Sequence, residues 1–376
     1  MLEELENKVA LCDIDAKYIE LDNNNEILGS ALMAIEELSD IAAILDKEDI
    51  SKDALQMASV ATESICNRLG YNPRDKIVPS LESLSVAARA NASKIALEKI
   101  GDTIGKIWEA IKSFFRRILE GIKSLWTKID ETIEVNDSNI KRIEERIADI
   151  KQHKKVIQPN LEINMATYCN TFNASSGDDL PRSIKRTLED HADILKHRST
   201  INKDIEKLLK SIPSIKTTEE AVKLAEELNP LKHIKATTYA SGLQLNTAVH
   251  GAEGIVHISL ARHTNELNSV RSKPMSIDKL EQVLVELKKF RKVVDEQRAV
   301  AKESEAIIKA AIISADELSK NNETDHTLSG IRAKLFESGQ ESLLVISARL
   351  PKVGMWAYIA GISYMNANLG RYVDPR

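Results

Sequence analysis

Two series of apolar residues recur every seven positions between residues 100 and 133, the second series four residues after the first. The members are Ile104, Ile111, Ile118 and Leu125, followed by Trp108, Phe115, Ile122 and Ile129. A sustained seven-residue repeat predicts a long amphipathic helix. Further apolar residues beside the repeat widen the stripe beyond what a two-stranded coiled coil needs, which is typical of a helix packed in a bundle.

Isoleucines between residues 140 and 150 predict a second amphipathic helix, which starts after Asn136-Asp137-Ser138 and ends before Pro159. We expect it to fold back on the first helix. Residues 83–172 are therefore predicted to form a long helical hairpin. A polar stretch from Asn170 to Pro181 predicts a loop at the end of this unit.

Residues 1–82 are predicted to form an acidic helical segment. The pattern indicates one helix over Leu2–Leu21, a second from Ile27 to Leu45, and a third that begins after the N-cap candidate Ser51 and stops at Gly70. Asn72-Pro73 and Val78-Pro79 then break the helical pattern, so we place a linker and a domain boundary there.

Residues 173–376 are predicted to form a helical bundle with an apolar C-terminal region. Shorter helices extend to about Leu228, and a long heptad-like helix over 276–320, with Ser276 as its N-cap, is roughly 65 Å long. Leu343–Tyr372 is apolar but interrupted by one proline and three glycines, and we expect it to pack inside the assembly or against a partner. The predicted fold class is all-α, an elongated multi-helix bundle with long amphipathic, partly coiled-coil helices.

Composition supports this prediction, because only 4% of the residues are aromatic and 29% are charged. Acidic residues are concentrated at the front of the chain. Residues 1–50 hold fourteen Asp or Glu and three Lys or Arg, a net charge of −11, so the other 326 residues carry −5 − (−11) = +6.

The three cysteines show no paired spacing, which fits a reducing compartment better than a disulfide scaffold. The acidic start of the chain lacks the features of a secretory signal. The uncharged run Val353–Gly370 is barely long enough to span a bilayer and is diluted by glycine and asparagine, so we expect no transmembrane span, while surface attachment to a membrane stays open.

Catalytic and cofactor motifs are not found in the sequence, and we predict a protein that is not an enzyme and needs no cofactor or metal. His250 and His257 could share a helix face, and His263 with Glu266 has i,i+3 spacing, but ordinary polar packing is the favoured interpretation of both pairs. Asp325-His326 is interpreted as part of a solvated loop rather than as a catalytic dyad.

The helix over residues 100–133 has three interpretations. Bundle core is favoured; binding to a membrane surface and pairing with a partner helix are the alternatives. Its basic residues are diluted by acidic ones, which disfavours DNA recognition. The candidate interaction stripe consists of Trp108, Ile111, Phe115, Ile118, Ile122 and Trp126.

The segment Val78-Pro79-Ser80-Leu81-Glu82-Ser83-Leu84, followed by the Trp-containing run from Ile104 to Phe115, resembles the internal head and related virion proteins of phiKZ-like giant tailed phages. In that family an N-terminal propeptide often ends at a small residue, any residue, then Glu. The resemblance implies a candidate cleavage motif at Ser80, Leu81 and Glu82, with residues 1–82 as a propeptide.

We therefore expect a non-enzymatic virion structural or internal head protein, processed by a phage prohead protease and packaged with, or ejected alongside, DNA. Its expected partners are other virion proteins or further copies of itself, with non-specific proximity to packaged DNA, and its expected location is the capsid interior or the host cytoplasm. The alternatives are a membrane-active helical protein of the pore-forming or vesicle-binding kind, and a cytosolic helical adaptor.

Overall fold

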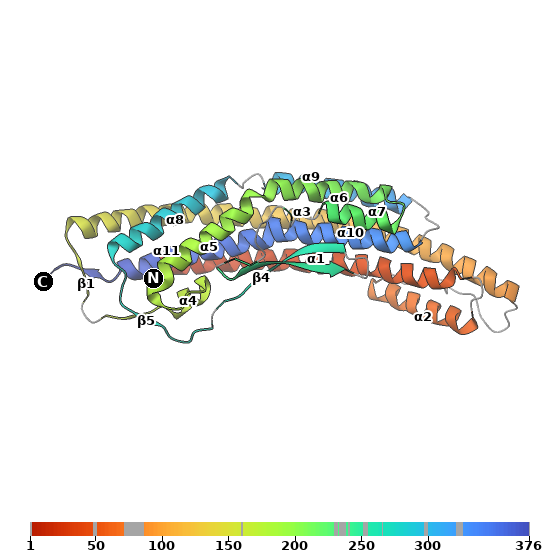
Figure 1. The fold of residues 1–376 in the computed structure, drawn as a ribbon, viewed down its shortest axis with the longest axis horizontal. Helices are drawn as coiled ribbons and strands as arrows, with labels where there is room; N and C mark the ends of the chain where they lie inside the picture. The colour runs from red at the N-terminus through yellow and green to blue at the C-terminus, as the bar shows by residue number, and fades with distance from the viewer. Residues whose placement is uncertain are drawn as a thin grey trace.

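The fold was analysed in a computed structural model. The residues that it describes are 2–47, 51–70, 86–158, 161–228, 232, 238–239, 241–250, 255–264, 266–296, 300–320 and 326–375. Within them the protein is an elongated bundle of helices, and the predicted all-α class is confirmed (Figure 1).

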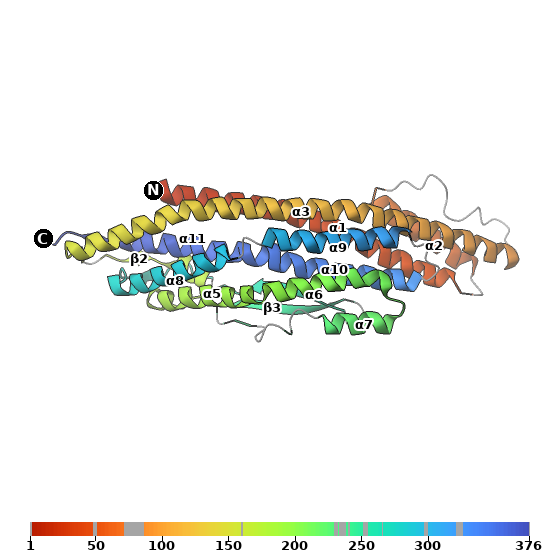
Figure 2. The same ribbon diagram turned by 90° about the horizontal axis from the view of Figure 1, so that it is seen from above.

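The helices lie in three layers, which are seen most clearly in Figure 2. One layer holds α1 and α3 side by side, the middle layer holds α9, α10 and α11, and the third holds α5, α6 and α8. The first layer consists of α1 (Leu2–Leu45) and α3 (Val86–Gln152), and α2 (Lys52–Arg68) packs against α1. The other helices are α4 (Ala166–Phe172), α5 (Leu180–Lys196), α6 (Arg198–Ser211), α7 (Thr218–Glu227), α8 (Ile277–Asp295), α9 (Val300–Lys320), α10 (His326–Leu344) and α11 (Leu350–Leu369).

Within the described part of the chain, three antiparallel strand pairs supplement the helices. Two are short: β1 (Val156–Ile157) pairs with β6 (Tyr372–Val373), and β2 (Ile163–Asn164) pairs with β5 (Arg271–Ser272). The third is a hairpin of β3 (Leu243–His250) and β4 (Ile255–Arg262), with Leu243 opposite Arg262, that lies against α10. The β1–β6 pair ties the chain after α11 to the end of α3.

The predicted break at Asn136 is wrong, because α3 is one continuous helix of 67 residues rather than a hairpin. Asn136 is fully buried, and its side-chain amide donates to the Thr132 carbonyl at 2.9 Å while its oxygen accepts from Asn139 at 3.2 Å. These bonds satisfy the polar side chains within the helix instead of capping a new one. The seven-residue series also continues through Asn136 to Ile143 and Ile150.

The predicted boundary between two helices in the first 45 residues is also wrong, since α1 runs without interruption over Leu2–Leu45. Asn24 bonds back to the Glu20 carbonyl at 2.9 Å, and Asn25 reaches across to Glu341 at 2.6 Å, so these amides are satisfied without ending the helix. The third helix is confirmed: Ser51 caps α2 by accepting from the Ala54 amide at 3.1 Å, and the helix ends before Gly70.

The single helix predicted over 276–320 is two helices. α8 ends at Asp295 with Glu296 as its C-cap, and α9 begins at Val300. α8 packs against α5, whereas α9 packs between α3 and α6 (Figure 2). A heptad count alone could not distinguish these two packing environments.

The apolar C-terminal region is an internal element, as expected, but Gly354 and Gly361 do not interrupt its helix, which ends at the C-cap Gly370. α10 continues through a π-helical turn, η4 (Val345–Arg349), into α11, with Pro351 in the first turn of α11. The stretch Leu328–Leu369 is long and apolar enough to cross a membrane by length and composition, but 72% of its most apolar window is buried inside the bundle. Burial of this extent is typical of a core helix.

Candidate functional site

The six residues of the candidate interaction stripe all lie in the hydrophobic core. Trp108 is 1% exposed, Trp126 is 4% exposed, and the other four are fully buried. The rings of Trp108 and Phe115 pack against Phe336 of α10, with centroid distances of 5.0 and 6.0 Å. The Trp126 indole donates to the Ser347 carbonyl in the π-helical turn at 2.9 Å. Contact between this stripe and any other molecule would require the bundle to open.

The candidate cleavage motif Ser80-Leu81-Glu82 lies outside the described residues, between the end of α2 and the start of α3. Cleavage there would break the covalent link between α1 and α2 and the rest of the chain. After such a cut, only the packing of α1 and α2 would attach them to the bundle.

α1 lies along α3 and α10 and buries one apolar face against them (Figure 1). Six large side chains of this face are less than 2% exposed: Ile14, Leu21, Leu28, Leu32, Ile35 and Leu38. Burying one such side chain contributes roughly 1.5–3 kcal/mol, so the six together contribute on the order of 10 kcal/mol before entropic costs. The facing side chains of α3 and α10 lose contact with water as well.

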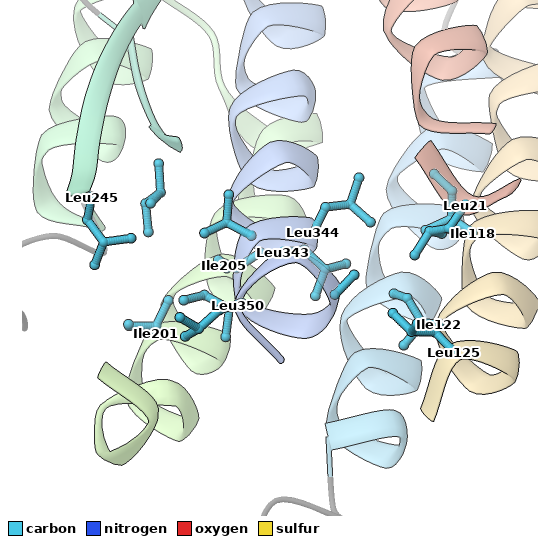
Figure 3. Close-up of a cluster of buried hydrophobic side chains, with 14 of the residues drawn as sticks. Leu21, Ile118, Ile122, Leu125, Ile201, Ile205, Leu245, Leu343, Leu344 and Leu350 are labelled. Atoms are coloured by element: carbon cyan, nitrogen blue, oxygen red, sulfur yellow. The ribbon is translucent and has the colours of Figure 1, made fainter. Parts of the chain in front are cut away.

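α1 approaches α3 closely at Gly121. A Cβ atom at this position would lie 2.8 Å from Cδ1 of Leu21, which is too close for a real contact. Figure 3 shows Leu21 beside Ile118, Ile122 and Leu125 of α3. The absence of a side chain at residue 121 thus lets the backbone of α3 come close enough for Leu21 to be fully enclosed.

A polar cluster joins α1 to the C-terminal helices at the edge of this apolar contact. Arg349 Nε donates to the Tyr18 hydroxyl at 2.9 Å, and its guanidinium is 3.3 Å from both Asp22 and Glu341. The Asn25 amide donates to Glu341 at 2.6 Å. We call Tyr18, Asp22, Asn25, Glu341 and Arg349 the Arg349 cluster.

The position of the Arg349 cluster affects the ionisation of its members. Burial raises the pKa of the Tyr18 hydroxyl, an effect that Arg349 opposes. Burial alone would lower the pKa of Arg349, but Glu341, Tyr18 and Asp22 together raise it above its ordinary value. Arg349 therefore stays charged and paired.

A second set of contacts lies one turn further along α11. Lys352 forms an ion pair with Asp15 at 2.9 Å, and its ammonium lies 4.1 Å from the centroid of the Tyr18 ring. The Trp356 indole donates to Asp15 at 3.4 Å. Basic residues of the C-terminal helices are thus matched to acidic residues of α1, so part of the charge asymmetry seen in the sequence is used in contacts within the fold.

The histidine pairs do not lie on helices. His250 and His257 belong to the paired strands β3 and β4, where His250 is opposite Ile255 and His257 opposite Ala248. His263 follows β4, and its ring nitrogen is 3.2 Å from the side chain of Gln244. Asp325 lies outside the described residues, and His326 begins α10. No group of three or more potential metal ligands occurs among the described residues.

An open groove of about 530 Å³ lies between α5 and α8, away from α1. Acidic and basic side chains both line it, which gives it no single preference for an anion or a cation. The lining residues are Asp178, Pro181, Arg182, Lys185, Lys279, Gln282, Val285 and Glu286.

One comparison with known proteins matches the part of the chain that contains α1 and α3. Residues 4–162 match the family model of phiKZ-like phage internal head proteins. The predicted family resemblance is thereby confirmed. No curated protein and no solved structure matches the chain.

The matched region, residues 4–162, comprises nearly all of α1, together with α2, α3 and β1. Its core is shared with the rest of the chain, because α3 packs against α9 and α11 while α1 packs against α10. The Arg349 cluster likewise joins the region to helices outside the match. The family-like part and the rest of the chain therefore fold as one hydrophobic unit.

The contacts of α1 were not predicted from the sequence. The basic partners Arg349 and Lys352 lie more than 300 residues from their acidic partners, and nothing in the local pattern connects them. The β3–β4 hairpin had a detectable signal, namely the alternation of Leu243 and Leu245 with polar residues. Leu243, Leu245 and Ile258 form its buried face.

Proposed function

We propose that the protein is a structural component of the interior of a phage head. The observation that carries this proposal is the match of residues 4–162 to phiKZ-like phage internal head proteins. The fold supports it, because the matched helices α1 and α3 are principal elements of a continuous helical core. Its partners are then other virion proteins or further copies of the chain, in proximity to packaged DNA.

We further propose that a phage prohead protease cuts the chain after Glu82. Proteases bind substrates in extended form, and several other tripeptides of the same pattern lie within helices. Ala96-Leu97-Glu98, for example, is inside α3, and Ala96 is fully buried. Ser80-Leu81-Glu82 falls between α2 and α3, and Gly251-Ala252-Glu253, which shares the pattern, falls between β3 and β4.

The distribution of charge is consistent with this processing. Residues 51–82 contain four basic and four acidic residues, so residues 1–82 carry the whole net charge of −11 and residues 83–376 carry +6. A cut after Glu82 divides the chain into an acidic part and a basic part, and the basic part is better suited to proximity to DNA.

Intact-mass spectrometry of the protein from phage particles, beside the recombinant full-length chain, tests the proposal. We expect a product that begins at Ser83. Glu82→Gln should abolish that product, whereas the matched variant Glu98→Gln, in the helical copy of the pattern, should be cut normally. An uncut chain in mature particles would contradict processing, and absence of the protein from particles would contradict the virion assignment.

A further inference from the structure

We infer that a cut between α2 and α3 does not release the N-terminal segment, residues 1–82, which instead stays bound to the rest of the protein without a covalent link. The inference takes its biological meaning from the proposed processing after Glu82. Its physical basis is the interface of α1, which is independent of whether a protease acts there.

The apolar part of the interface is continuous over most of α1. Fully buried side chains occur from Ile14 to Leu38, and Leu45 at the end of the helix is only 2% exposed. An interface of this kind resembles a domain core rather than a transient contact, because its large side chains are enclosed and not merely touched. None of these contacts depends on the chain connection through residues 71–85.

Polar contacts fix the position of α1 along the bundle. Arg349 pairs with Asp22 near the middle of α1, and Lys352 pairs with Asp15, about two helical turns closer to the N-terminus. Leaving the bundle would break the bonds of Arg349 to Tyr18 and Asp22 and the bond of Glu341 to Asn25, although Arg349 and Glu341 would still pair with each other. The loss of these hydrogen bonds adds to the cost of dissociation.

The consequence is that cutting and release are two separate events. After the cut alone, the two parts form one complex with the net charge of −5 of the intact chain. The basic part, with its charge of +6, becomes a separate molecule only after a second step that unfolds α1 or withdraws it from α3 and α10.

An engineered cut tests this inference without the phage protease. The recognition sequence of a site-specific protease replaces residues 74–80 in the full-length chain, and the protein is cut to completion. Size-exclusion chromatography with mass analysis of each fraction then follows the two parts. We expect them to elute together in equal amounts, with the helix content unchanged. Separate elution, or aggregation of the larger part after cutting, overturns the inference.

A matched pair of neighbouring residues shows whether the buried face of α1 holds the segment. Leu28 is fully buried, whereas Ile27 is 46% exposed. In the cut protein, Leu28→Glu should increase the dissociation constant of the segment at least tenfold. Ile27→Glu should change this constant by less than about threefold. Circular dichroism of the uncut variants checks that both fold, and equal retention by the two variants would contradict the assigned face.

The outcomes are distinct from those of the particle experiment. Co-elution of the engineered parts together with an uncut chain in phage particles would remove the proposed processing but leave the inference about the interface intact. A product starting at Ser83 in particles, with separate elution of the engineered parts, would support the proposed processing and overturn the inference about the interface.

Discussion

At the scale of single residues, His191 stands out because it is an ionisable group fully enclosed by the bundle. Its Nδ1 is 2.7 Å from the Thr187 carbonyl, so this nitrogen carries the proton, and its ring meets Phe290 edge-on at 6.3 Å. Its Nε2 has no hydrogen-bond partner. Burial lowers the pKa of His191 to about 4, so the folded protein keeps the ring neutral over most of the physiological range.

This lowered pKa predicts a loss of stability in acid. Between pH 6.5 and 4 the unfolded chain binds a proton at residue 191 that the folded chain does not. The stability that the protein has with a neutral His191 is therefore fully present above pH 6.5 and is lost as the pH falls towards 4. The loss is about 3 kcal/mol for a difference of this size. Urea unfolding of wild type and His191→Gln should be measured across this range. As the pH falls, the free energy of unfolding of the wild type should decrease by that amount relative to that of the variant. A difference that does not vary with pH would contradict the assignment.

At the scale of elements, the sequence predicts where helices occur better than where they end. The buried seams of α1 and α3 were visible in the spacing of apolar residues. The polar stretch between Leu21 and Ile27, which contains Asn25, and the stretch at Asn136 were mistaken for breaks. Asn136 bonds within its own helix and Asn25 bonds to Glu341 of α10. The second of these partners comes from tertiary packing, which local propensity does not contain.

Contact between α1 and α3 predicts opposite effects at two glycines. Gly29 in α1 has no atom within 4 Å of an added Cβ, so Gly29→Ala should stabilise the protein by about 0.5–1 kcal/mol through helix propensity. Gly121→Ala gains the same propensity but must displace the enclosed Leu21. We expect its free energy of unfolding to lie about 1–3 kcal/mol below that of Gly29→Ala. Chemical denaturation measures both, and equal stabilisation would show that α3 can move away from α1 freely.

The division into 276–295 and 300–320 illustrates a related limit. Both halves keep the apolar spacing of one long helix, but α8 faces α5 and α9 faces α3 and α6. The repeat predicts that a face is buried, and it does not specify which neighbour buries it. The domain boundaries at residues 82 and 172 stay predictions.

At the scale of the whole molecule, α1 covers apolar surface on helices that come from both the family-like region and the remainder of the chain. This arrangement predicts the behaviour of residues 83–376 produced without the N-terminal segment. The uncovered faces of α3 and α10 should bind the dye ANS and drive self-association, because monomeric soluble proteins rarely expose a long continuous apolar surface.

Fluorescence and size-exclusion chromatography of the shortened chain measure both effects. Co-expression of residues 1–82 as a separate polypeptide is the control, and it should restore a species of full-length size with little dye binding. A shortened chain that is monomeric and binds no dye would mean that the bundle closes over the vacated surface.

The antiparallel alignment of α1 beside α3 also has a mechanical consequence. Force applied along the axis of α1 strains its buried side chains and ion pairs together, so the helix resists sliding as a unit. Force applied sideways at one end strains them one at a time. In the intact chain the end of α1 near Leu45 is tethered through α2 to α3, whereas a cut after Glu82 frees that end. Processing would therefore change how the helix can be pulled away, from sliding against all contacts at once to peeling from a newly freed end.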